Sequence, residues 1–501
     1  MIFSSPEFIF AFVPVVFLVA FLVRKLVSNT AVLLIWLTMS SLFFYGFWKA
    51  DYLPIIVVSI LANWLLGRWI LSAGNRNRVP LFIGIILNLL AIGYYKYFDF
   101  FVSNVNAVAG TEFSEMGLLL PLGISFFTFQ QIAYLVDTSR GLVGRTGILE
   151  YAFFVSFFPQ LIAGPIVHHR HILPAVRQGE SFGFKSEEIL KGLHAFGIGF
   201  VKKVVFADMF AVAASSVFDA ADAGQAISTH DAMLGAVSYT FQIYFDFSGY
   251  TDMAIGLGHM FGVKLPKNFD SPYKSLGIIE FWRRWHVTLS EFLRDYLYIP
   301  LGGNRKGMPR RYFNLITTMF LGGLWHGASW TFVVWGVAHG LLLMINHTIR
   351  RLVPRPDGRV ALMFFRLGSW LVTFAAINLT WVSFRATTWS GMWEMYRAIF
   401  GFGGASASTS FAFDPREMSY PIPYHQHLPE SVLFWPWLVV LVGLLICVMM
   451  PNTWQLTERY EIRRGRYRLL ANLATVCLFV LGSWFILYLQ NRITEFIYFN
   501  F

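Results

Sequence analysis

Charged side chains are scarce in this sequence. Of its 501 residues only 13% are Asp, Glu, Lys or Arg, and 56% are hydrophobic. An ordinary soluble domain carries about twice that share of charge. The shortage argues against a soluble globular protein, and apolar runs of about 20 residues, the length of a transmembrane helix, recur along the chain. We therefore expect a membrane protein.

Cysteine and several catalytic motifs are also missing or rare. The only cysteines, Cys447 and Cys477, lie far apart in apolar segments, so neither a disulfide framework nor a thiolate metal site is indicated. The zinc-protease motif HExxH, a phosphate loop of the GxxxxGKS type and a GxSxG nucleophile elbow are absent. A metalloprotease of that type, an NTP-driven pump and a serine hydrolase are therefore disfavoured.

The apolar runs predict roughly 11 to 13 membrane-embedded helices in one all-α, polytopic membrane domain covering residues 1–501. The first run has no basic residue before it and no small-residue cleavage site after it, which favours a retained helix over a secretory signal. The predicted spans are 7–23, 30–48, 52–71, 79–98, 117–136, 149–167, 190–215, 232–258, 312–348 (expected to hold two), 361–383, 431–450 and 469–490.

The net charge of +11 reflects topology, not nucleic-acid binding, because its basic residues gather in alternate loops. These clusters are Arg24 with Lys25, residues 75–78, Arg140 with Arg145, and residues 459–468. Basic loops stay in the cytoplasm. We therefore expect both termini and the Gly-, Ser- and Pro-rich loop at 401–431 to face the periplasm.

Two stretches mix polar and aromatic residues. The first, 239–258, contains Asp246, Ser248 and Asp252, whose spacing favours structural pairing over a metal site. The second, 280–298, has a helical phase that gathers aromatic and apolar side chains on one face, which predicts an amphipathic helix at the bilayer surface. That face consists of Trp282, Trp285, Leu289, Phe292 and Tyr296. The "GGNRKG" that follows reads as a turn, and the "HHRH" at 168–171 as a cluster at the level of the lipid headgroups.

Two histidines stand in unusual settings, His286 in "RRWHVTLS" and His326 in "GGLWHGAS". No Lys, Arg, Asp or Glu occurs between Tyr312 and Ile349, and an ionisable group inside a membrane span is a functional hypothesis by default. An imidazole has an ordinary pKa near 6.5, and burial lowers that pKa, so the neutral ring accepts a proton from an alcohol. Gly322, Gly323 and Gly327 leave room for a substrate or another backbone. His347, beside Arg350 and Arg351, is expected at the headgroups.

Four long motifs carry a resemblance to a known family. They are "YFDFSGYTDMAIGLG", "EFWRRWHVTLSEFLRDYLYIPLGGNR", "LGGLWHGASWTFVVWGVAHG" and the terminal "FIYFNF". With them the chain resembles the membrane-bound O-acyltransferases, called MBOAT, and within these the bacterial alginate O-acetyltransferase branch, whose relatives acetylate other exopolysaccharides or peptidoglycan. The similarity runs in order along essentially the whole chain. The sequence departs from the pattern at His168, where Arg is expected, although Arg170 is near, and at Thr251, where Ser is expected.

The resemblance implies a ring of helices around a transmembrane channel that joins a cytoplasmic acyl donor to an extracytoplasmic acceptor. It assigns the family's near-universal histidine to His326 and the second site residue to His286. No metal or bound cofactor is implied, and acetyl-CoA or another acyl thioester is the co-substrate. The candidates for the substrate channel are Asp246, Ser248, Asp252, Trp285, Trp325, Arg283 and Arg284.

The function implied by the resemblance is O-acetylation of alginate or a related exopolysaccharide, carried out in the bacterial inner membrane. Periplasmic or membrane-anchored acetyltransferases are the expected partners, because the polymer would receive the acetyl group indirectly; nucleic acid is not expected. Two alternatives stay open. One is D-alanyl or peptidoglycan O-acyl transfer by the same fold. The other is a polytopic transporter whose histidines form a proton relay.

Overall fold

The structure is a computed structural model that describes residues 1–27, 29–74, 77–177, 182–402, 434–462, 465–488 and 497. Within these residues all regular secondary structure is helical and no strand occurs, which confirms the expected all-α fold. From residue 403 onward, the loop expected at 401–431 lies outside the described residues.

The chain forms two compact units. Unit 1 comprises Met1–Gly197, Tyr250–Lys267 and Tyr460–Asn472, and unit 2 comprises Ile198–Gly249, Asn268–Arg459 and Leu473–Phe501. Four of the five boundaries fall inside helices, which are α10 (Ser186–Val201), α12 (Thr229–Met260), α20 (Thr453–Ile462) and α21 (Arg466–Tyr488). The fifth, between Lys267 and Asn268, lies after the end of α12.

Seven of the described helical segments are long and apolar enough to cross a membrane, or up to eight if the bent pair Pro436–Met449 and Thr453–Ile462 is one span. The protein is therefore a multi-pass membrane protein. The sequence suggested more membrane-embedded helices because it counted apolar runs that form shorter elements. α2 (Thr30–Gly46) has 17 residues, α6 (Ile124–Ser139) has 16, and the run at 149–167 is divided between α7 (Ile148–Ser156) and α8 (Phe158–Leu161).

Unit 1 contains a cluster of three helices joined by side-chain hydrogen bonds of buried amides. α3 (Leu53–Ala73) packs against α4 (Val79–Ile92) and α6. The Asn88 Nδ2 donates to Asn63 Oδ1 over 2.6 Å, and Gln131 Nε2 donates to Ser59 Oγ over 2.9 Å. Such bonds hold helices together where surrounding lipid is as apolar as the side chains. The other elements of this unit are η1 (Phe8–Phe12), α1 (Val13–Leu26), η2 (Ala50–Tyr52), η3 (Gly93–Tyr97), α5 (Phe98–Ala109) and α9 (His169–Arg177).

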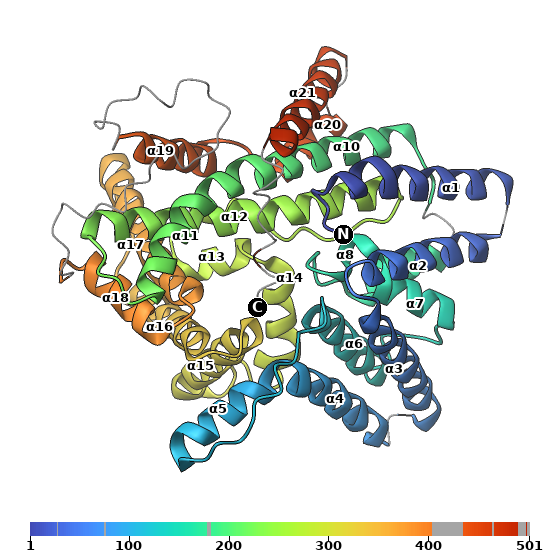
Figure 1. Cartoon of the computed structure of the whole chain (residues 1–501), viewed down its shortest axis with the longest axis horizontal. Coiled ribbons are helices and arrows are strands. Elements are labelled where there is room, and N and C mark those ends of the chain that lie inside the picture. The colour runs from blue at the N-terminus through green and yellow to red at the C-terminus, as the bar shows by residue number, and fades with distance from the viewer. Residues whose placement is uncertain are drawn as a thin grey trace. The chain divides into compact units, whose positions relative to one another are not determined.

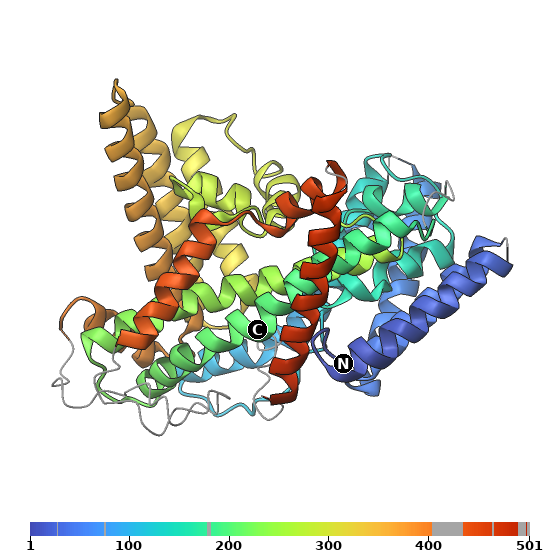
Figure 2. The ribbon, with the colours of Figure 1, turned by 90° about the horizontal axis from the view of Figure 1, so that it is seen from above.

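Unit 2 is built around three long helices, α15 (Gly307–His326), α16 (Trp330–Leu352) and α17 (Arg359–Arg385) (Figure 1). α16 packs against both of the others, and its antiparallel arrangement with α17 is visible in Figure 2. The expected pair of helices in 312–348 is thus confirmed. The remaining elements are η4 (Lys202–Ala207), α11 (Asp208–Asp222), η5 (Pro272–Lys274), α13 (Ile278–Arg284), α14 (Val287–Leu293), η6 (Arg294–Tyr298), α18 (Trp389–Ile399) and α19 (Phe434–Met449).

The prediction of a single amphipathic helix at 280–298 is wrong. α13 ends at Arg284, α14 begins at Val287, and η6 continues as a π-helix from Arg294. Between α13 and α14 the backbone of His286 is left-handed, with φ at 42°, a conformation that no helix continues through. The expected common face is therefore broken at His286. The turn expected after residue 301 is present.

Candidate active site

His286 is a buried residue in a strained backbone conformation. Its side chain is 0% exposed, and it is the residue that precedes the first turn of α14. A left-handed φ costs a non-glycine residue about 1–3 kcal/mol and persists only when surrounding contacts enforce it, often at a functional site. Burial lowers the pKa of His286 to about 3, which keeps the imidazole neutral.

The contacts that enforce this conformation come from Asn268. The backbone carbonyl of Asn268 accepts the Val287 N–H over 2.9 Å. Its side-chain Oδ1 lies 2.9 Å from Thr288 Oγ1, 3.3 Å from the Thr288 amide nitrogen and 3.1 Å from His286 Nδ1. One asparagine therefore holds three consecutive residues at the break between α13 and α14.

His326 is the last residue of α15 and is 4% exposed. Three aromatic rings surround its imidazole, with centroids 4.8 Å away for Trp325, 5.0 Å for Trp335 and 5.0 Å for Phe384. The Trp325 ring also lies 6.2 Å from the ring of His286. The structure thus brings both histidines singled out in the sequence within 6.2 Å, between ring centroids, of one tryptophan.

Glycines near His326 allow two backbones to approach. A Cβ at Gly323 would lie 3.0 Å from the Cα of Gly336 in α16, and a Cβ at Gly327 would collide with the Phe332 ring. The room that the sequence predicted at these positions is therefore filled by α16 and its side chains. This close packing fixes the end of α15, and so the place of His326.

Of the other candidates from the sequence, the structure places some beside the two histidines and others away from them. Trp285 is 1% exposed and its ring lies 4.9 Å from that of Trp381, within the aromatic cluster around the histidines. Arg284 instead pairs with Glu280 at 2.8 Å and donates to the Asp270 carbonyl, and Arg283 is exposed. Described contacts therefore associate Trp285 and Trp325 with the histidines, but not the two arginines.

Asp246 takes part in structural pairing, as the sequence favoured. Its Oδ1 lies 2.7 Å from the Nζ of Lys203, a buried lysine whose Nζ is also 3.3 Å from Asp208 Oδ1. The Asp246 Oδ2 accepts the backbone N–H of Ile497 over 2.8 Å, across 251 positions of sequence. Of the other two candidates in this stretch, Ser248 is buried and Asp252 is half-buried.

The "HHRH" segment begins α9 in unit 1. His168 is buried in the protein, with 4% of its surface exposed, so the expectation that it lies among lipid headgroups is wrong. His169 Nδ1 lies 3.4 Å from Asp137 Oδ2. Burial, with the nearby charge of Arg170, lowers the pKa of His171 to about 4. Protein contacts, not headgroups, therefore dominate this segment.

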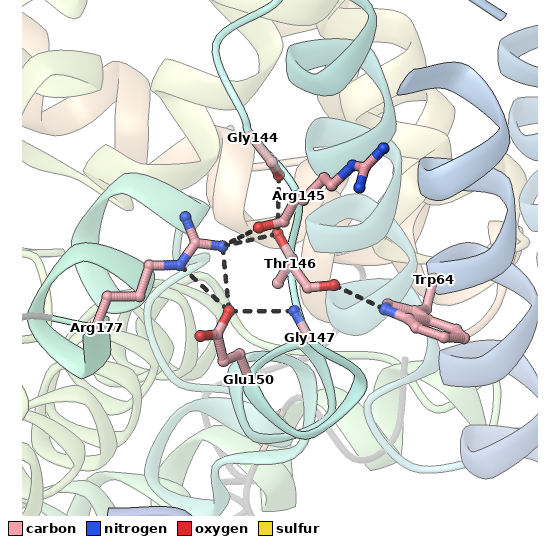
Figure 3. A network of polar contacts seen from close by, with 7 residues as sticks. All are labelled: Trp64, Gly144, Arg145, Thr146, Gly147, Glu150 and Arg177. Atoms are coloured by element: carbon pink, nitrogen blue, oxygen red, sulfur yellow. Dashed lines mark hydrogen bonds and ion pairs between the residues drawn. The ribbon is translucent and has the colours of Figure 1, made fainter. Parts of the chain in front are cut away.

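The C-terminal end of α9 is hydrogen-bonded to the loop that precedes α7 (Figure 3). Arg177 Nη2 donates to Glu150 Oε2 over 3.1 Å and to the Arg145 carbonyl over 2.8 Å. The Glu150 Oε2 also accepts the Gly147 N–H, and Trp64 Nε1 donates to the Thr146 carbonyl. These bonds fix a loop that carries the exposed Arg145.

Several residues around the site were not selected as candidates, although His339 lies in the same charge-free run as His326. Asn268 is 18 positions from His286 and shares no helix with it, so periodicity gives no signal. Trp335 lies between two imidazoles, 5.0 Å from His326 and 4.8 Å from His339. His339 is 0% exposed, with its nitrogens 3.3 Å from Trp282 Nε1 and 3.0 Å from Thr380 Oγ1.

His347 differs from these buried histidines. Its ring is half-buried and lies 2.9 Å from Arg311 Nη2. Among the described residues no group of three or more His, Cys, Asp or Glu side chains is placed to hold a metal ion. The chemistry available at the site is therefore that of two buried imidazoles in an aromatic surrounding, which suits proton transfer to and from a hydroxyl.

The structure describes a multi-pass membrane protein with two buried histidines near one tryptophan, and comparison with known proteins identifies its class. The model of MBOAT, the membrane-bound O-acyltransferase family, matches residues 138–385, a range that contains both histidines. The chain belongs to this family and is an O-acyltransferase, and such enzymes use acyl donors.

Individual relatives are similar over most of the chain. A peptidoglycan O-acetyltransferase of Helicobacter pylori is 42% identical over 81% of this chain and 81% of its own. A probable alginate O-acetylase, AlgI, of Pseudomonas aeruginosa is 40% identical over 80% of this chain and 75% of its own. The teichoic acid D-alanyltransferase of Bacillus subtilis is 29% identical over 44% of this chain and 58% of its own.

Proposed function

We propose that this protein transfers acetyl groups from a cytoplasmic thioester, such as acetyl-CoA, to a hydroxyl acceptor outside the bacterial inner membrane, for O-acetylation of a polysaccharide. The Helicobacter and Pseudomonas relatives described above, 42% and 40% identical, are named for O-acetyl transfer, whereas the D-alanyltransferase is similar over less than half of the chain. The acceptor polymer is alginate or a related exopolysaccharide, with the glycan of peptidoglycan as the alternative.

The observation that carries the proposal is the pair of buried histidines on Trp325, 4.8 Å and 6.2 Å away between ring centroids. In the proposed step the acceptor oxygen attacks the thioester carbonyl while His326 takes the hydroxyl proton. The carbon–sulfur bond then breaks, and the proton passes to the departing thiolate. An ester and a free thiol are the products, so the step needs no oxidant or reductant.

The donor is proposed to enter from the cytoplasm, where basic loops meet its phosphates. Two exposed arginines in unit 1, Arg140 and Arg145, belong to the predicted cytoplasmic side. A channel that admits a single acceptor group does not suit a polymer. We therefore propose that a periplasmic or membrane-anchored acetyltransferase receives the acetyl group first. Efficient acetylation of polymer by the purified chain alone, with acetyl-CoA, would contradict this relay.

The variant His326→Ala tests the function. The readout is the O-acetyl content of the exported polymer, and the level of the variant in the membrane is checked by immunoblot. We expect a loss of about 10²- to 10⁴-fold, the contribution of a positioned base. His347→Ala is the control, because it removes a half-buried imidazole that contacts Arg311 and not Trp325. Normal acetylation by a well-expressed His326→Ala protein would falsify the assignment.

Isotope labelling in the same cells distinguishes acetyl transfer from the two remaining alternatives. If the protein transfers D-alanine, the polymer should become labelled when cells receive labelled D-alanine, and not when they receive labelled acetate. A transporter predicts accumulation of a solute without any acyl transfer, and membership of an acyltransferase family argues against it. Labelling of the polymer from acetate that depends on His326 supports acetyl transfer over both.

A further inference from the structure

The contacts of Asn268 determine which of its side-chain atoms faces the site. A backbone N–H only donates, so the Thr288 amide requires an oxygen at the Asn268 atom 3.3 Å away. The same atom lies 3.1 Å from His286 Nδ1. An amide oxygen only accepts, so Nδ1 must carry a hydrogen to complete this bond. The neutral imidazole of His286 then has its lone pair on Nε2.

We infer that Asn268 is a positioning residue that fixes the proton of His286 on Nδ1, so that Nε2 accepts a hydrogen bond from the acceptor substrate and does not stabilise an oxyanion. The inference rests on the proposed function and deepens it. A neutral ring with its only proton on Nδ1 has none to give at Nε2. Of the two roles open to a second site residue, orientation of the acceptor and oxyanion stabilisation, the hydrogen bonding selects the first.

The local structure opposes the other tautomer and a rotated ring. With the proton on Nε2, the lone pair of Nδ1 would face the lone pairs of the Asn268 oxygen, a repulsive contact in a dry interior. The ring of Phe247 stands edge-on to the imidazole at 89°, with centroids 4.7 Å apart. The backbone of His286 is also held, because the Val287 N–H is bonded to the Asn268 carbonyl.

The role assigned to His286 has a consequence for the substrate class. His326 takes the proton of the reacting hydroxyl, so the hydrogen bond to His286 Nε2 must come from a second donor on the acceptor. A neighbouring hydroxyl or an amide N–H supplies it. We therefore expect the direct acceptor to carry a second donor close to its reacting hydroxyl, as a sugar diol or a serine in a peptide chain does.

Asn268→Asp tests the role of Asn268 because the carboxylate is nearly isosteric and still accepts from Thr288 and from His286. Its negative charge stabilises the imidazolium and raises the pKa of His286. On lowering the pH, the variant should lose the Nε2 lone pair sooner than the native protein does. The acid limb of its pH profile should then lie at least about one pH unit higher, a tenfold change in proton concentration.

The measurement is incorporation of labelled acetate from acetyl-CoA into polymer by permeabilised membranes that contain the whole export system, across a series of buffer pH values. Asn268→Ala should lower activity about 10-fold or more, with no upward shift of the acid limb, because both tautomers become available. Asn346→Asp is the matched control for added charge. Its oxygen accepts the Ile279 N–H and contacts no histidine in the site, so its pH profile should match the native one.

The outcomes separate this inference from the proposed function. If His326→Ala is inactive but Asn268→Asp has the native pH profile, Asn268 has only a structural role and the inference is overturned. If His326→Ala stays active, the proposed function itself fails. Should Asn268→Ala not accumulate, the isosteric Asn268→Asp decides alone, because its acid limb either moves or does not.

Discussion

Replacing Lys203 with Met should destabilise unit 2 far more than a typical substitution does. The Lys203 side chain is 4% exposed and its Nζ lies between two carboxylates, 2.7 Å from Asp246 and 3.3 Å from Asp208. Met has a similar volume, so the change removes the charge with little loss of packing. The carboxylate of Asp246, whose side chain is 1% exposed, then remains buried without the lysine that neutralises it.

The magnitude follows from leaving a buried charge uncompensated. Removing one partner of a buried ion pair costs about 3–5 kcal/mol, whereas removing both partners together is often nearly neutral. The double variant Lys203→Met with Asp246→Asn should therefore recover much of the stability. Asn also keeps an oxygen for the Ile497 N–H. For the single variant we expect a melting temperature roughly 5–10 °C lower.

The assay is thermal unfolding of the detergent-solubilised protein, followed by tryptophan fluorescence. Lys202→Met is the control, because this neighbouring lysine lies in the same π-helix, is half-buried and donates to Thr453 Oγ1. Its loss should cost about 1 kcal/mol. Equal melting temperatures for the two single variants, or a double variant less stable than Lys203→Met, would refute the argument that Lys203 neutralises Asp246.

Two further predictions concern packing and topology. Gly323→Ala should cost about 1–3 kcal/mol, because its Cβ would press against the backbone of α16 at the Phe332 carbonyl and at Gly336. Gly368→Ala, where a Cβ would meet nothing within 4 Å, should leave the same thermal unfolding assay unchanged. A single cysteine at position 462, which is exposed, should resist an impermeant thiol reagent in intact cells, because the basic residues of 459–468 predict a cytoplasmic segment. Its labelling in intact cells would overturn the topology.

The long apolar helices were predictable because lipid demands length and hydrophobicity, both visible in one dimension. α16 and α17 are of this kind. The run at 312–348 was expected to hold two helices, and in the structure α15 ends at His326 and α16 begins after the Ser329 cap. Some shorter elements were counted as spans because the apolar run in the sequence is longer than the helix that it contains. Residues 117–123 precede α6 without joining it.

The site was only partly predictable. Its histidines stand out because a titratable ring is unusual in such surroundings, and the family motifs contain them. The backbone of His286 was not predictable, since the pattern of 280–298 suits a continuous helix and the break is enforced by Asn268 from another segment. Arg283 and Arg284 were expected in the substrate channel, but Arg284 pairs with Glu280 and Arg283 is exposed.

The bond between Ile497 and Asp246 constrains the order in which the protein is assembled. Asp246 lies in α12 and its partner comes 251 positions later, after α21. During synthesis α12 is available long before Ile497 is. Until then the Asp246 carboxylate lacks one of its two described partners, so the interior of unit 2 is incomplete. Closing so long a loop is slow, so we expect the packing around Asp246 in unit 2 to be completed only after the segment that follows α21 has been made.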